Sequence, residues 1–109
     1  MEMHNPPHPG EFIQEVYLEP LEISHRAVAA KLRVYPSTFT RLINGQSNIS
    51  PEMALRLSKT LGRSPESWMA MQSNYDLWHA KENFSLDDVQ EIDFAMVKVQ
   101  LFVSTGFAP

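Results

Sequence analysis

The chain of 109 residues contains no cysteine and no long uncharged apolar run. Without cysteine it can form neither disulfides nor a cysteine-ligated zinc site. Without about 20 consecutive apolar residues it has no candidate membrane span. The N-terminal residues also lack the basic stretch and apolar core of a secretory signal. We therefore expect a single soluble cytoplasmic domain, since this length suffices for a hydrophobic core.

The sequence patterns of enzymes are equally scarce. We find no glycine-rich phosphate loop, no nucleophile–base pair and no metal-ligand spacing. The four histidines, His4, His8, His25 and His79, follow no ligand pattern. The sequence therefore predicts a protein without catalytic activity, metal site or cofactor.

Positive charge is scarce overall but concentrated in one segment. The net charge is −4. Between Ser24 and Arg63, seven bases against one acid give +6, whereas two bases against twelve acids give −10 in the rest of the chain. A basic middle between acidic ends indicates an electropositive face suited to phosphates. It also argues against an adapter that binds only proteins.

Three helix starts share one pattern, a capping residue followed by proline at the first helical position, where the missing N–H is harmless. They are His8-Pro9-Gly10-Glu11, Ser50-Pro51-Glu52 and Ser64-Pro65-Glu66. We expect the first helix to end at about Leu18, before a break at Pro20, and the second to end at Gly62.

Two shorter helices are predicted between these. Ser24 can cap one whose apolar side is Val28, Ala29 and Leu32. Tyr35-Pro36 starts the other, which ends at Asn44-Gly45 and turns inward Phe39, Leu42 and Ile43.

Residues Ser24 to Gly45 thus predict a helix-turn-helix. Ala29 lets the two helices approach, Val34 fills the turn, and Phe39 with Leu42 packs the second helix onto the domain. Arg33 stands where glycine is common, and a positive φ there costs roughly 1 kcal/mol. The turn therefore either keeps that conformation or relaxes into a helical one.

The outward side of the second helix carries hydrogen-bonding groups suited to the DNA major groove. The candidates for base contact are Ser37, Thr38, Thr40, Arg41 and Asn44. Arg41 is the first choice, since arginine can bond guanine O6 and N7 together. Candidates for phosphate contact are His25, Arg26, Arg33, Gln46, Ser47 and Asn48, although the loop amides and serine also suit ordinary turn chemistry.

The helix that starts at Ser64 carries an aromatic stripe, and after His79 the pattern is less decisive. Trp68, Tyr75 and Trp78 form a stripe that favours core or dimer contact over a stacking surface for single-stranded nucleic acid. Ser85-Leu86-Asp87-Asp88 is typical of another helix start. The segment 96–103 fits either a helix face or a strand, and its β-branched residues favour a strand paired with its copy in a second subunit.

Four stretches together resemble the HigA antitoxins, a branch of the Cro-like (XRE-type) repressors. They are His8-Pro9-Gly10-Glu11-Phe12-Ile13, residues 36–45, residues 61–68 and Gln72-Ser73-Asn74-Tyr75-Asp76-Leu77. The resemblance covers about residues 8–80. It divides the chain into a flexible N-terminus (1–7), a DNA-binding domain (8–80) and a C-terminal extension (81–109) expected to dimerise.

The resemblance implies an all-α, five-helix, lambda-repressor-like fold and a homodimer that binds operator DNA and represses its own operon. It also implies a protein partner, a HigB-type mRNA-cleaving toxin that the dimer neutralises. Arg41, Tyr35, Ser37 and Thr38 fall where the family contacts its operator. The alternative is a stand-alone Cro-like repressor without a toxin.

Overall fold

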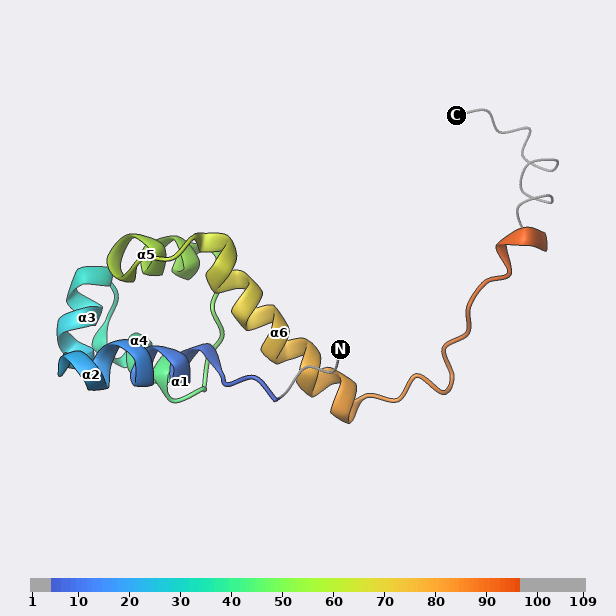
Figure 1. Ribbon diagram of the computed structural model, residues 1–109, viewed down its shortest axis with the longest axis horizontal. Helices are drawn as coiled ribbons and strands as arrows, with labels where there is room; N and C mark the ends of the chain where they lie inside the picture. Colours follow the sequence, from blue (N-terminus) through green and yellow to red (C-terminus); the bar gives the residue numbers. More distant parts are fainter. Residues whose placement is uncertain (1–4, 97–109) are drawn as a thin grey trace, which may run out of the picture.

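A computed structural model describes residues 5–96, which form an all-α structure without strands in that range (Figure 1). The first helical stretch runs without interruption through three labelled parts, α1 (Pro9–Ile13), the π-helix η1 (Gln14–Leu18) and α2 (Glu19–Leu21). It is followed by α3 (His25–Leu32), α4 (Pro36–Ile43), α5 (Pro51–Leu61) and α6 (Pro65–Asn83). Counted as one, the first stretch makes five helices, which confirms the expected fold class for the described residues.

Side-chain caps explain why these helices begin where they do. The backbone N–H of Gly10 donates to His8 Nδ1 at 2.9 Å. The hydroxyl oxygens of Ser24, Ser50 and Ser64 each accept from the backbone N–H three residues later, at 3.0–3.1 Å. Each cap gives a partner to an N–H that the helix itself leaves unpaired. The helix starts predicted at His8, Ser24, Ser50 and Ser64 are confirmed.

The break expected at Pro20 is wrong, since the first helical stretch continues to Leu21. Proline breaks an α-helix because it lacks the N–H and its ring meets the carbonyl four residues back. Directly before Pro20 the chain forms a π-helix, in which the Glu19 N–H bonds to the Gln14 carbonyl five residues back. This wider turn accommodates the proline ring. The stretch ends at Glu22, whose φ is 54°.

The core draws apolar side chains from every long helix. The largest fully buried members include Trp68, Phe39, Ile13 and Leu32. Gly10 brings α1 against α4, because a Cβ there would collide with the Leu42 carbonyl and lie 2.8 Å from the Ile43 Cα. The first helical stretch therefore supports α4 directly.

α6 continues past the core and points away from it, toward the right of Figure 1. No helix within residues 5–96 is long and apolar enough to span a bilayer.

The helix expected at Ser85 does not form: residues 87–88 make a turn in which the Asp87 N–H donates to Ser85 Oγ at 3.2 Å. Without a surface to pack on, so short a helix is unstable. The strand-or-helix question for residues 97–103 lies outside the described residues.

Candidate nucleic-acid interface

α4 has one buried side and one exposed side, as the spacing of its apolar residues predicts. Phe39 is 0% and Leu42 1% exposed, and both lie in the core. On the other side Ser37, Arg41 and Asn44 are exposed. Packing of the apolar side therefore directs these polar groups outward, in the orientation that groove contact requires.

Of the two conformations expected for the turn between α3 and α4, the structure has the strained one. The backbone of Arg33 lies in the left-handed region, with φ 63° and ψ 43°. The N–H of Val34 bonds to the Ala29 carbonyl at 3.1 Å, and that of Arg33 to the Ala30 carbonyl at 3.2 Å, which closes the C-terminus of α3. Arg56 on α5 donates from Nη1 to the carbonyls of Leu32 at 2.7 Å and Arg33 at 3.4 Å. These bonds hold the turn in a conformation that glycine would adopt more readily.

A hollow of about 510 Å³ lies where α4 begins, lined by Arg33, Val34, Tyr35 and Thr38. Tyr35 is 79% exposed and Arg33 is exposed as well, whereas Val34 and Thr38 are half-buried. The Tyr35 side chain forms no cap on α4. The N-terminus of α4 thus presents an aromatic ring, a guanidinium group and a hydroxyl, side chains that suit an anion such as phosphate.

Thr40 and His25 differ from the other candidates because their polar atoms bond to each other. His25 Nδ1 lies 3.2 Å from Thr40 Oγ1, and His25 Nε2 lies 3.1 Å from Gln14 Oε1. Gln14 Nε2 in turn donates to Glu19 at 3.2 Å. This chain of hydrogen bonds links the first helical stretch through α3 to α4. The side chains of His25 and Thr40 are half-buried. They therefore help to hold α4 in place, and they also lie at the border of its outer side.

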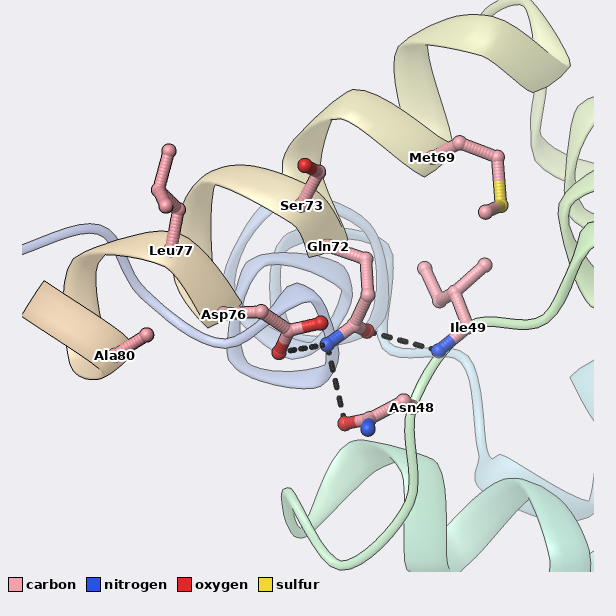
Figure 2. A pocket seen from close by; sticks show the side chains of 8 residues that line it. All are labelled: Asn48, Ile49, Met69, Gln72, Ser73, Asp76, Leu77 and Ala80. Atoms are coloured by element: carbon pink, nitrogen blue, oxygen red, sulfur yellow. Dashed lines mark hydrogen bonds between the residues drawn. The ribbon is translucent and has the colours of Figure 1, made fainter. Parts of the chain in front are cut away.

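The loop after α4 carries the remaining amide and serine candidates. Gln46 and Asn48 are exposed and Ser47 is half-buried. Figure 2 shows Gln72 of α6 reaching into this loop: its Oε1 accepts from the Ile49 N–H at 2.8 Å, and its Nε2 donates to Asn48 Oδ1 at 3.1 Å. The same Nε2 donates to Asp76 at 3.0 Å. The loop is therefore fixed by α6, and the Asn48 amide nitrogen is still able to donate.

The exposed candidates come from consecutive parts of the chain, from the start of α3 through α4 to the following loop. These are Arg26, Arg33, Tyr35, Ser37, Arg41, Asn44, Gln46 and Asn48.

Three supporting residues were missed by the sequence analysis: Gln14, Arg56 and Gln72. Gln72 could have been found, because a glutamine four residues after the buried Trp68 interrupts an otherwise apolar and aromatic stripe. Arg56 and Gln14 carry no such signal, since each bonds to a residue distant along the chain.

In the aromatic stripe of α6, Trp68 is buried, and Tyr75 and Trp78 are half-buried. Trp68 is fully buried, donates from Nε1 to the Gly62 carbonyl at 2.9 Å, and packs against the rings of Phe12 and Tyr17. It therefore belongs to the core and not to a stacking surface. Tyr75 packs edge-on against His8, with ring centroids 4.9 Å apart. That contact gives the buried His8 Nε2 an aromatic neighbour, whereas residues 5–96 offer this atom no hydrogen-bond partner.

Known proteins match the chain over most of its length. Residues 15–68 match the helix-turn-helix family. The HTH-type transcriptional regulator YddM of Escherichia coli K12 is 36% identical over 92 residues, 84% of this chain and 97% of its own length. PA4674 of Pseudomonas aeruginosa, solved in complex with its operator DNA, is 34% identical with a TM-score of 0.74, covering 84% of this chain and 98% of that one. Antitoxin HigA of the same species, solved with the higBA promoter, is 30% identical with a TM-score of 0.66, covering 95% of this chain and 97% of that one.

Proposed function

The chain belongs to the helix-turn-helix family of transcriptional regulators, and on that premise we propose that it is a DNA-binding antitoxin that represses its own operon. It binds operator DNA as a homodimer, with α4 of each subunit in a major groove. Paired helices are needed because one short helix contacts few base pairs, and two half-sites about 34–36 Å apart supply affinity and sequence selectivity together.

The observation that carries this proposal is the division of α4 into two sides. Phe39 and Leu42 are buried, whereas Ser37, Arg41 and Asn44 point outward from a helix held by neighbours on both sides. In the groove, Arg41 bonds a guanine through two N–H groups, and Ser37 and Asn44 donate to or accept from neighbouring bases. Tyr35 and Thr38 contact bases at the start of the helix, and Thr40 does so from its edge.

Phosphate contacts set the position of the dimer on the duplex. Arg26 and Arg33 neutralise phosphates on one side of α4, together with His25 at its edge. Gln46, Ser47 and Asn48 donate to phosphates on the other side. Such contacts supply affinity without base selectivity and make binding salt-dependent. The net charge of +6 between Ser24 and Arg63 supports this assignment.

The antitoxin role finds support in the resemblance to HigA. We propose that the dimer also binds and neutralises a HigB-type toxin, an mRNA-cleaving ribonuclease. YddM, which is similar over nearly its whole length and is named as a transcriptional regulator, favours a second candidate, a repressor that has no toxin partner.

Two measurements test the two parts of the proposal separately. Mobility shifts with the DNA upstream of the gene test operator binding, and a failure to bind more tightly than to unrelated DNA of equal length contradicts it. Co-expression with the neighbouring open reading frame tests the antitoxin role through growth rescue and co-purification. Operator binding without rescue or complex formation supports the stand-alone repressor instead.

A further inference from the structure

Residues 84–96 combine apolar side chains with acids and contain no base. Four acids, Asp87, Asp88, Glu91 and Asp93, alternate with large apolar residues. Those apolar side chains are all 57–71% exposed: Phe84, Leu86, Val89, Ile92, Phe94 and Met96. So much apolar surface in one short segment is typical of a sequence that is buried by a partner.

A groove between α3 and α5 has the complementary chemistry. Most of its lining is apolar, with Ile23, Ala27, Val28 and Leu61, and its cavity measures about 540 Å³. Of the remaining lining residues, Lys31 belongs to α3 and Lys59 to α5. Both lysines are exposed. A groove lined by apolar residues and by one lysine from each of its two helices suits a segment with apolar and acidic side chains.

The acids Asp87 and Asp88 match the two lysines in number and are opposite in charge. They occupy a turn that is closed by the Val89 N–H, which bonds to the Leu86 carbonyl at 2.9 Å. Both acids are exposed, and so are the flanking Leu86 and Val89. The turn therefore offers two acids and two apolar side chains together, which complement the two lysines and the apolar residues of the groove.

Within one molecule, the first part of residues 84–96 cannot reach the groove between α3 and α5. α6 has 19 residues and is therefore about 28 Å long. Figure 1 shows α3 at one end of the helical body and the last turn of α6 at the other. Leu86 follows Asn83 by three residues, so it stays within about 10 Å of the end of α6. A groove that holds Leu86 therefore belongs to a different molecule.

We propose that residues 84–96 of one molecule dock in the α3–α5 groove of a second copy of the chain. The exchange is reciprocal, so that each copy gives its segment and receives the other. This interface does not involve the outer side of α4, and it goes beyond the proposed DNA and toxin binding.

The absence of cysteine allows a clean cross-linking test in the full chain. One chain carries Ser85→Cys beside the acids, and the other carries Thr60→Cys, which lines the groove. The matched control is Ser58→Cys, a half-buried residue of the same helix that does not line the groove. Under mild oxidation we expect the mixed disulfide with Thr60→Cys to form about tenfold faster than with Ser58→Cys, because docking raises the local concentration. Equal rates overturn the proposal.

Dilution distinguishes docking between two copies from contact within one chain. A chain carrying both Ser85→Cys and Thr60→Cys is diluted with cysteine-free protein. Cross-linked dimers whose yield falls on dilution support docking in a second copy, whereas a cross-link within one chain, unchanged by dilution, contradicts it.

Charge reversal tests the pairing of the acids with the lysines. Lys31→Glu with Lys59→Glu on the groove chain should abolish the rate advantage, and Asp87→Lys with Asp88→Lys on the partner chain should restore it. Circular dichroism checks that the variants fold. The charge pairing is overturned if the rate advantage survives the two lysine-to-glutamate changes alone. It is also overturned if the two aspartate-to-lysine changes fail to restore that advantage in folded protein.

Discussion

α4 and residues 84–96 both contain apolar residues, but only α4 buries them. In α4 the apolar residues follow one another at three- and four-residue spacing, and the helix lies between the first helical stretch and α3. In residues 84–96 the apolar side chains are exposed and only one turn of helix, at residues 94–96, is present. Apolar content alone therefore does not make a core. Spacing must match the helix period, and a neighbouring surface must be available.

The largest expected effect contrasts one phenylalanine from each region. Phe39→Ala should lower the free energy of unfolding by about 3–5 kcal/mol, because it leaves a cavity in the core. Phe94→Ala should change it by no more than about 0.5 kcal/mol, because that ring is already in contact with water. Urea unfolding followed by circular dichroism in dilute solution measures both. Similar losses for the two variants would remove the distinction between the regions.

The second prediction concerns the exposed side of α4. Arg41→Ala should weaken operator binding by about 1–3 kcal/mol while leaving stability within about 0.5 kcal/mol. Lys81→Ala, an exposed base near the end of α6, is the matched control and should leave affinity nearly unchanged. Mobility shifts at fixed salt measure both, and equal effects would mean that Arg41 supplies only general positive charge.

The third prediction compares two serines that follow the same sequence pattern. Ser24 caps α3, whereas Ser85 accepts from Asp87 in a turn that no helix follows. Ser24→Ala should cost about 1 kcal/mol of stability, and Ser85→Ala should stay within about 0.5 kcal/mol. Thermal unfolding of the two variants gives the comparison. A loss at Ser85 as large as at Ser24 would show that residues 85–88 do form a stabilised element.

The smallest effect comes from strain inside the well-packed region. Arg33→Gly should raise the free energy of unfolding by about 0.5 kcal/mol, because glycine adopts a positive φ without the steric cost but loses more chain entropy. Arg33→Ala keeps the strain and serves as the control. Chemical unfolding of both variants measures the difference, and greater stability of the alanine variant would argue against strain at this turn.

Local chemistry explains which parts of the fold could be predicted from the sequence. Caps such as Ser24 and Ser50 act on residues three positions away, and the burial of Phe39 follows from helical spacing. The bond from Arg56 to Leu32 spans 24 residues and depends on how α5 packs, so no local pattern reveals it. Pro20 was misjudged because a proline normally ends an α-helix, and the π-helix that accommodates it leaves no clear mark in the sequence.

The same reasoning applies to the candidate interface. The outward side of α4 could be predicted because it lies opposite the apolar residues that fix the helix. The partial burial of Thr40 and His25 could not be predicted from the sequence, because it arises from a hydrogen-bond chain through Gln14 on the first helical stretch. The supporting contacts of an interface are therefore harder to predict than its exposed groups.

We propose that α4 turns Arg41 toward the edges of the bases. The most direct test measures operator affinity for a set of DNAs, each changed at one base pair, with the wild-type protein and with Arg41→Ala. We expect the wild-type to lose about 1–3 kcal/mol at one G·C pair in each half-site, and the variant to lose that preference there while keeping its preferences elsewhere. An unchanged profile for Arg41→Ala would contradict the assignment of α4 as the helix that contacts the bases through this residue.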